Sequence, residues 1–559
     1  MGFQLSPGVN VTEIDLTTVV PSVLTTAGAF AGTFQWGPAN QVVLVDSEIT
    51  LSKIFGAPDS NSAVSFFTAA NFLSYGNNLS VVRAIGANAH NATANSSAKV
   101  TIDNGDTFTY SYLNNNNSNA LGAFAARYAG SLGNSLSVTV IDTGNTSRSD
   151  IFSSAPGTSQ YALNNGGSDD ELHIAVIDAG GMFTGTKNTV LETFPFVSKA
   201  SDAINLNDGT SNYYKQVIFN KSKYIYAVDP ADYSTTSTTW GKTASTTFAS
   251  ITGGANTYSL AAGTDEVPTD AKLITAFNTF ANKETIDISL LLTGNASATV
   301  QSSVMTLASS RGDCVAFISP PYNAVVGNSG SEASSVTAWV GGLNPTSFAV
   351  ADSGWKYQFD VYNNVYRWIP LNGDIAGLCV NTDSVRDPWY SPAGFNRGAI
   401  KNAIKLAWNP SKTYRDTLYA AGVNPVVSFP GQGIVLFGDK TLQIKPSAFD
   451  RINVRRLFIV LEKSISKAAQ FSLFEFNDEF TRAQFVALVS PFLRDIQGRR
   501  GITDFKVVCD TTNNTQQVID SNQFVGDIYI KPARSTNFIQ LNFVAVGTGV
   551  DFTTVVGAA

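Results

Sequence analysis

Histidine, cysteine and methionine are scarce in this chain of 559 residues, which contains two His, three Cys and three Met. The two histidines, His90 and His173, cannot build a zinc site of three histidines or a rich acid–base network. Cys314, Cys379 and Cys509 lie far apart in the sequence, so neither a disulfide framework nor a zinc knuckle is expected. We therefore expect buried, reduced thiols, and neither a metal ion nor a cofactor.

Long apolar runs are also missing. No stretch of 18 apolar residues occurs, so no membrane-spanning helix is predicted. The first residues, MGFQLSPGVN, show no basic region followed by an apolar stretch, so export through a signal peptide is not expected. Charged residues make up 14% of the chain and hydrophobic residues 43%. This composition indicates a folded protein with a weakly charged surface, which suits packing against copies of itself.

Recognisable catalytic motifs are absent as well. The sequence GGMFTGTK (Gly180–Lys187) resembles a phosphate-binding loop but has Thr186 where the loop requires lysine. A ligand could lie beyond the strand ends near Thr293–Asn295. No convergent set of titratable side chains accompanies that position, so we expect a protein that is not an enzyme. An enzyme built on this part of the fold remains an alternative.

Charge is unevenly distributed along the chain. From Arg386 onward there are 20 basic and 14 acidic residues, a net charge of +6. The preceding 385 residues have 16 basic and 29 acidic residues, a net charge of −13. This asymmetry predicts an acidic partner for the C-terminal third. An acidic protein surface fits at least as well as nucleic acid, because the basic residues are not interleaved with aromatics as a base-stacking platform requires.

Two regions alternate apolar strands with helices, which is typical of a parallel sheet covered on both faces. We expect residues 27–85 and 268–385 to form one α/β domain that is split by an insertion. The predicted strands are Val42–Val45, Leu79–Ile85, Ile286–Leu292 and Cys314–Ile318, and the predicted helices are Phe66–Leu73, Lys272–Asn282 and Val300–Leu307.

The insertion, residues 86–267, is rich in Asn, Thr, Ser and Gly. Its alternating segments, such as Ser135–Ile141 and Leu172–Ile177, predict mainly β structure. An insertion of this size is tolerated on an exposed loop, so it should project outward.

The C-terminal third, residues 386–546, should be an α+β domain. One helix is predicted at Arg451–Lys467, and Thr481 with Gln484 forms a capping box that opens a second helix ending near Gly498. Predicted strands follow at Phe505–Cys509, Gly526–Lys531 and Phe538–Val546.

The two ends of the chain alternate apolar and polar residues next to glycine or proline. Residues 1–26 and 547–559 could simply be frayed termini. They also have the pattern of arms that add a strand to a neighbouring sheet, because such pairing needs apolar side chains at alternate positions. The residues concerned are Val9, Val11, Thr12 and Ile14 at one end, and Val550, Phe552 and Val556 at the other.

The segment Val365–Ile404 combines aromatic, proline and charged residues as a rigid contact surface does, although a well-packed domain junction would have the same composition. It contains Tyr366, Trp368, Trp389 and Tyr390, three prolines, and Arg367, Arg386 and Arg397 paired with Asp374, Asp383 and Asp387.

This segment closely resembles the tail sheath proteins of contractile-tailed bacteriophages. The resemblance extends in the family's order along the whole chain. The other matching segments are Ser6–Ile14, Thr184–Tyr214, Phe437–Ile465, Phe474–Phe485, Phe492–Ile502 and Val507–Thr515.

The resemblance implies an α+β multidomain fold with an inner C-terminal assembly domain (386–546), N- and C-terminal β arms, a split α/β domain and a mainly β outer insertion. It implies a structural subunit of the virion that polymerises helically around the inner tail tube. Contraction would drive the tube through the host envelope for genome delivery. The implied partners are further copies of the chain, the tube protein, and baseplate and tail terminator proteins, without direct nucleic-acid contact or membrane insertion. Synthesis and assembly would occur in the host cytoplasm.

The resemblance also implies roles for particular residues. The terminal arms would join the sheets of neighbouring subunits, and we expect Ile539, Leu541 and Phe543 to belong to the sheet that accepts them. Arg494, Arg499 and Arg500 flank a predicted helix end, where positive charge is favoured on electrostatic grounds alone. The functional interpretation is that they face the inner tube.

Two other interpretations remain open. The chain could form the sheath of a headless contractile particle, such as a tailocin or an extracellular injection system. More distantly, the polar and cysteine-poor composition would permit a surface-layer or adhesin protein.

Overall fold

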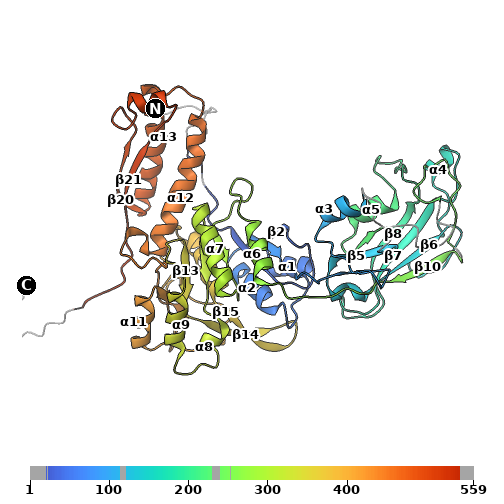
Figure 1. Ribbon diagram of the computed structural model, residues 1–559, viewed down its shortest axis with the longest axis horizontal. Coiled ribbons are helices and arrows are strands. Elements are labelled where there is room, and N and C mark those ends of the chain that lie inside the picture. Colours follow the sequence, from blue (N-terminus) through green and yellow to red (C-terminus); the bar gives the residue numbers. More distant parts are fainter. Residues whose placement is uncertain (1–19, 22, 114–120, 229–238, 252, 542–559) are drawn as a thin grey trace, which may run out of the picture. The chain divides into compact units, whose positions relative to one another are not determined.

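The computed structural model describes residues 20–21, 23–113, 121–228, 239–251 and 253–541. These residues form two compact units, one made of residues up to Phe471 and one that begins at Ser472. Figure 1 shows the helices and strands of both units.

The larger unit is built around a seven-stranded sheet with the order β17-β13-β12-β11-β1-β3-β2. All neighbouring strands are parallel except β2 and β3. Strand β1 pairs with β3 on one side and with β11 on the other, where Gly28 lies opposite Leu290. The segments before and after the insertion therefore share one sheet, as the α/β pattern predicts. The strands are β1 (Gly28–Gly32), β2 (Val42–Val45), β3 (Leu79–Arg83), β11 (Leu290–Leu292), β12 (Val315–Ile318), β13 (Ala349–Asp352) and β17 (Val423–Asn424).

Helices cover both faces of this sheet. Leu290 and Leu292 of β11 belong to the core that packs against α2 (Ala63–Leu73) and α10 (Asn372–Val385). Leu291 faces the opposite core, beneath α6 (Asp270–Asn278) and α7 (Ala298–Arg311). Because alternate residues of the strand are buried on opposite faces, the strands show the continuous apolar runs seen in the sequence. Other helices of this unit are α1 (Glu48–Phe55), α8 (Tyr322–Val325), α9 (Glu332–Gly341), α11 (Lys412–Ala420) and α12 (Ile452–Ala469).

The sheet does not end where the sequence suggested. Strand β17 lies beyond residue 385 and pairs with β13. The larger compact unit ends at Phe471 and the smaller one begins at Ser472. A two-residue strand gives no periodic signal, so the sequence pattern could not include it in the sheet. The larger unit also contains two small sheets, made of β14 (Trp355–Asp360), β15 (Val365–Pro370) and β16 (Lys405–Leu406), and of β18 (Val426–Phe429) and β19 (Gly433–Leu436).

The insertion is mainly β structure. It contains an antiparallel sheet of order β10-β6-β7-β8 and a three-stranded sheet of order β4-β5-β9. Its elements are β4 (Asn91–Thr93), α3 (Gly105–Phe108), β5 (Phe124–Ala129), β6 (Leu136–Asp142), α4 (Gln160–Asn164), β7 (Glu171–Asp178), β8 (Thr189–Ser198), α5 (Tyr214–Lys221), β9 (Ile225–Ala227) and β10 (Ala255–Ser259).

Arg83 joins the insertion to the α/β domain. Its buried guanidinium donates to the backbone oxygens of Phe34 (2.8 Å) and Gly37 (2.9 Å) in the α/β domain. It also donates to the oxygen of Ala129 (2.6 Å), at the end of β5 in the insertion. Burial lowers the pKa of Arg83 to about 10, so the side chain remains charged at neutral pH. The Arg83 side chain therefore binds backbone oxygens of both the α/β domain and the insertion.

The smaller unit packs one long helix against a hairpin-like sheet. Its elements are α13 (Glu479–Gly498), β20 (Ile502–Val508), α14 (Gln516–Asp520) and β21 (Asp527–Pro532). The helix begins earlier than the capping box predicted. Asp478 is the N-cap, and its carboxylate accepts the backbone N–H of Thr481 at 2.8 Å. Asp478 is the better cap because its ionised side chain also complements the helix dipole.

Candidate assembly interface

The sheet of the smaller unit has two strands, β20 and β21, which are antiparallel with Phe505 opposite Ile530 and Val507 opposite Ile528. In the described part of this unit, each strand pairs only with the other. One edge of each strand therefore presents backbone N–H and C=O groups without a ladder partner. Such edges are templates for pairing with another strand, which makes this sheet the candidate site for strand addition.

Helix α13 supports this sheet from one face. Val489, Leu493 and Ile496 are buried on the helix. Phe485 meets Phe524 edge to face with ring centroids 5.4 Å apart. A rigid helix behind the strands holds their edges in place, which lowers the ordering cost when a further strand is added.

Two of the acceptor residues predicted from the sequence, Ile539 and Leu541, lie in a segment without regular structure. The strand predicted at Phe538–Val546 is not formed over residues 538–541, which have no regular structure. Ile539 and Leu541 are 79% and 72% exposed, so they belong to no sheet in the described structure. Their alternating pattern fits a strand, but a strand forms only where a neighbour supplies the other half of its hydrogen bonds. The edges of β20 and β21 are the better candidates for the acceptor.

The other predicted residues of this mechanism lie outside the described residues. They are Val9, Val11, Thr12 and Ile14 of the N-terminal arm, and Phe543, Val550, Phe552 and Val556 near the C-terminus. Their predicted roles remain predictions.

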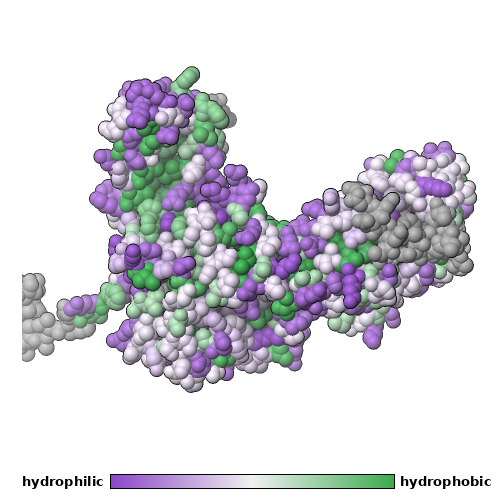
Figure 2. Space-filling model, in the orientation of Figure 1, coloured by the Kyte–Doolittle hydropathy of each residue, from purple (hydrophilic) through white to green (hydrophobic). Residues whose placement is uncertain are grey.

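Hydrophobic side chains gather at the surface of the smaller unit (Figure 2). Tyr529 on β21 is 60% exposed and Phe538 is 84% exposed. Exposed apolar area next to open sheet edges is typical of an interaction site, because pairing strands then bury side chains as well as backbone.

Arg494, Arg499 and Arg500 are all exposed, and they lie at the C-terminal end of α13 as predicted. Arg499 forms an ion pair with Asp495, one helical turn earlier, at 3.5 Å. Both side chains of that pair are more than half exposed, so it contributes little to stability. The group is a basic surface at a helix end, which fits both helix-dipole complementation and contact with an acidic partner.

The segment Val365–Ile404 pairs its charges differently from the sequence expectation. Asp374 bonds to Lys356 at 2.9 Å, and Asp383 bonds to Arg456 at 2.6 Å. Arg367 bonds to Asp360 at 2.6 Å. Each partner comes from outside the segment because residues adjacent in sequence point to different faces of a helix or strand. Trp389 is buried, whereas Tyr366 is 54% exposed, so the segment is part core and part surface.

At the carboxyl ends of the central strands, where a ligand could have bound, the space is occupied by residues of the chain itself. Asn372, at the start of α10, donates to the Gly294 oxygen at 2.8 Å and accepts the Gly294 N–H at 3.0 Å. Its backbone N–H donates to Ser319 Oγ, which in turn donates to Asp352. All four residues lie at the carboxyl ends of strands or against them. The crevice in which α/β proteins bind small molecules is thus occupied by α10.

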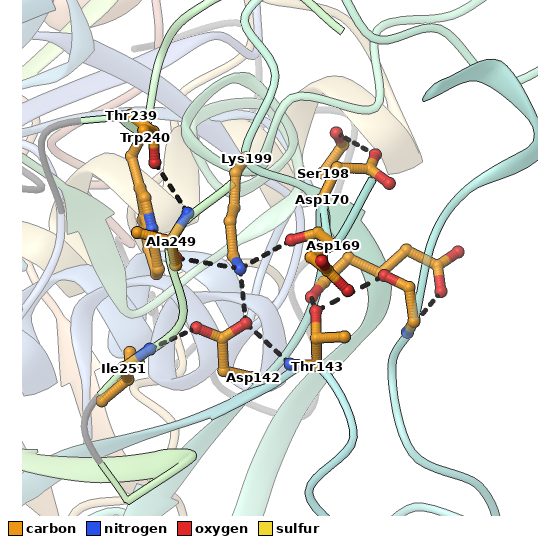
Figure 3. A network of polar contacts seen from close by, with 12 residues as sticks. Asp142, Thr143, Asp169, Asp170, Ser198, Lys199, Thr239, Trp240, Ala249 and Ile251 are labelled. Carbon is orange, nitrogen blue, oxygen red and sulfur yellow. Dashed lines mark hydrogen bonds and ion pairs between the residues drawn. The ribbon is translucent and has the colours of Figure 1, made fainter. Parts of the chain in front are cut away.

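A buried polar network in the insertion surrounds Lys199, whose side chain is fully buried (Figure 3). Its ammonium lies 2.5 Å from Asp142 and donates to the backbone oxygen of Asp169 at 2.8 Å. It also lies 5.2 Å from the ring centre of Trp240. Asp142 accepts the N–H of Ile251 at 2.7 Å. Burial lowers the pKa of Lys199, and Asp142 opposes that shift. With these partners in place, the network is a structural clamp.

His173 and the three cysteines have contacts that fit a structural role. His173 accepts the N–H of Phe196 at Nδ1 and contacts the Ser154 oxygen through Nε2. All three cysteines are free and buried, and burial raises the pKa of Cys379 to about 11. Among the described residues, no group of three or more His, Cys, Asp or Glu is arranged to hold a metal ion. Over the same part of the chain, no helix is long and apolar enough to cross a membrane.

The fold defines a multidomain α+β protein, and among its described residues the β20–β21 sheet has unpaired outer edges. Three family models match the chain in succession. Residues 25–84 of this chain match the N-terminal region of domain III of the tail sheath protein Gp18. Residues 266–442 match the phage tail sheath protein central domain, and residues 445–545 match the phage tail sheath C-terminal domain. The chain belongs to the phage tail sheath protein family.

Individual relatives match over almost the whole chain. The tail sheath protein of Vibrio phage KVP40 is 34% identical over an alignment that covers 99% of this chain and 100% of the relative. The tail sheath protein of Enterobacteria phage T4 is 32% identical, with 99% of each chain covered.

Solved structures of low sequence identity share the fold. The sheath tail protein from Listeria innocua has a TM-score of 0.53 at 10% identity and covers 92% of this chain and 96% of its own. The sheath tail protein from Desulfitobacterium hafniense has a TM-score of 0.51 at 10% identity, with 94% and 100% covered. These likenesses support the predicted α+β multidomain fold.

Proposed function

We propose that this chain is the structural subunit of a contractile phage tail sheath. Copies polymerise helically around an inner tail tube, and contraction drives the tube through the host envelope for genome delivery. The observation that carries the proposal is the β20–β21 sheet, whose outer edges are unpaired among the described residues, in a chain that matches sheath proteins along almost its whole length. No catalytic step is required, because two packings of rigid subunits can differ in free energy.

The terminal arms, residues 1–26 and 547–559, would supply the strands that neighbouring sheets lack. A strand added to the free edge of β20 or β21 satisfies backbone groups of both chains. Such a link is flexible along the connecting chain and strong at the pairing site. It would keep subunits joined while their rigid bodies repack.

The inner tube protein is the proposed partner of Arg494, Arg499 and Arg500. Exposed ion pairs contribute about 0.2–1 kcal/mol each, so a few of them hold the tube without locking it.

Residues 386–546 would form the inner assembly domain and residues 86–267 the outward insertion. Baseplate and tail terminator proteins would contact the two ends of the sheath. The subunit would be made and assembled in the host cytoplasm and remain in the virion.

A headless contractile particle is the second candidate. A sheath of the anti-feeding prophage in its contracted state has a TM-score of 0.50 with this chain at 13% identity, and covers 97% of it. This likeness concerns the fold, which contractile particles with and without a capsid would share. The genes beside the coding sequence would separate the two, because a phage requires capsid and terminase genes.

Negative-stain microscopy of the purified protein tests the main proposal. We expect regular tubes at high protein concentration, because the subunit would carry both the proposed acceptor sheet and, in its arms, the proposed donor strands. Discrete globules at every concentration and ionic strength tried would contradict it.

A further inference from the structure

The inward face of the small sheet β15-β14-β16 buries charged and polar side chains beside the apolar Ile369 and Leu406. Antiparallel sheets usually bury an apolar face and expose a polar one. Here the inward face carries Lys356, Gln358 and Asp360, all buried. They are paired with Asp374 (2.9 Å), Asn71 (2.7 Å) and Arg367 (2.6 Å) respectively.

The outward face carries an aromatic cluster. Tyr357 lies opposite Trp368, and Phe359 lies opposite Tyr366, so all four side chains share this face. Their ring centroids lie 4.6 Å apart for Tyr357 and Trp368, and 5.1 Å apart for Phe359 and Tyr366. Phe359 is 41% exposed and Tyr366 is 54% exposed. Packed aromatic rings left open to water are expected where a partner covers them.

A cation lies at one side of this aromatic face. Lys405 on β16 places its ammonium 4.9 Å from the ring centre of Tyr357 and 5.7 Å from that of Trp368. Within the described residues, Lys405 has no carboxylate partner. The face therefore suits a surface that is both apolar and acidic.

The chain itself presents such a surface at Leu473–Phe480, the entry to α13. Phe476 and Phe480 are 84% and 75% exposed. Glu475 and Glu479 are exposed beside them, and neither has a cationic partner among the described residues. This segment is complementary to the aromatic face, because it combines apolar side chains with negative charge.

We propose that the aromatic face of β14 and β15 is an interface between copies of the chain, which accepts Leu473–Phe480 of a second copy. Because the two surfaces differ, the contact is not self-complementary, and it propagates from one subunit to the next. The inference rests on the proposed self-assembly and names a contact separate from strand addition.

Charge exchange tests the contact in the full-length protein. Lys405→Glu should raise the protein concentration needed for tube formation several-fold, because the introduced carboxylate would face Glu475 and Glu479. Combining it with Glu475→Lys and Glu479→Lys should restore assembly to within about twofold of the wild type. The matched control is Lys272→Glu, which reverses an exposed lysine on α6 and should have no effect. Circular dichroism and gel filtration would establish that each variant is folded.

A second variant removes the apolar part of the contact. Phe359→Ser with Tyr366→Ser should lower tube yield at least tenfold, whereas Leu163→Ser, at an exposed site in the insertion, should not. If the wild type assembles and both face variants assemble equally well, the interface is wrong while the sheath function stands. If Lys405→Glu impairs assembly and the exchanged charges do not restore it, the second copy's segment is wrong. A wild type that stays monomeric would contradict both the inference and the function.

Discussion

At the scale of single residues, the buried charges of this protein stabilise particular junctions. Arg83, Lys199 and Lys356 are each buried, and each is held by carboxylates or backbone oxygens from separate segments. A buried charge contributes little when paired, but removing its partner leaves an uncompensated ion. Each of these positions should therefore be intolerant of single substitutions.

Replacing Lys199 with Met should destabilise the insertion by about 3–5 kcal/mol, because Asp142 would remain buried without its cation. Hydrogen exchange measures the effect, and we expect faster exchange in β6, β8 and residues 239–251. Lys242→Met, at an exposed lysine in the same region, is the matched control. Equal protection in the two variants would mean that the clamp does not hold the insertion.

Asp352 should make stability depend on pH. Burial raises its pKa from 3.8 to about 8, so the folded state binds a proton more tightly than the unfolded state. The resulting stabilisation is fully present below about pH 4 and is lost as the pH rises to about 8, by at most about 1.4 kcal/mol per pH unit. Asp374 is the nearby carboxylate that contributes to the same shift.

The measurement compares the wild type with Asp352→Asn, which cannot titrate. Melting temperatures at pH 5 and pH 8 should show the wild type losing stability relative to the variant at the higher pH. A difference between the two proteins that does not change with pH would show that Asp352 has an ordinary pKa.

At the scale of elements, the predictable parts are those with internal periodicity. The strand Val42–Val45 was predicted with its observed bounds, and the apolar run at Cys314–Ile318 marks β12 to within one residue. Strand β12 is buried throughout, whereas β2 is an edge strand with Leu44 64% exposed, but in both the apolar run is local to the strand, so their own residues carry the signal. The strand predicted at Phe538–Val546 is not formed over residues 538–541, although Ile539 and Leu541 alternate with polar residues as in a strand. Pairing depends on a neighbour, which local sequence does not contain.

The buried polar side chains and exposed aromatic side chains of β14 and β15 were also beyond prediction. The aromatic residues of Val365–Ile404 indicated a contact surface, but not which of them face water. Their orientation depends on Lys356 and Gln358, whose partners Asp374 and Asn71 come from two helices. Binary patterning assumes an apolar interior, and here buried polar side chains paired with one another occupy much of that side.

The end of α13 allows a test of its proposed partner. Reversing charge at Arg499 and Arg500 (Arg499→Glu with Arg500→Glu) should preserve folding, since both are exposed. Sheath growth on purified tubes should fall, and more so at low than at high salt, because salt screens exposed charges. The measurement is the length of sheath per tube by electron microscopy. Growth that is unchanged at every salt concentration would assign these arginines to helix-dipole complementation.

At the scale of the whole molecule, the compact units and the terminal arms should separate folding from assembly. Deleting Met1–Asp15 or Val550–Ala559 should leave a folded monomer, because each segment is too short to contribute much of the core. Tube formation should be lost, because the open edges of β20 and β21 would have no donor strand. Gel filtration and microscopy measure the two properties separately. Regular tubes from either truncated protein would contradict the arm assignment.

The pairing of β1 with β11 also determines which parts of the fold can form first during translation. Strand β1 cannot pair with β11 until Leu290, the partner of Gly28, has been synthesised. The chain between these two residues includes all of the insertion. The antiparallel sheets of the insertion pair within that intervening chain, so they are free to form during translation. The nascent N-terminal strands, by contrast, keep one edge open until nearly 300 residues have been made. A host under translational stress would thus accumulate chains with a finished insertion and an unfinished sheet, which are the forms that chaperones recognise.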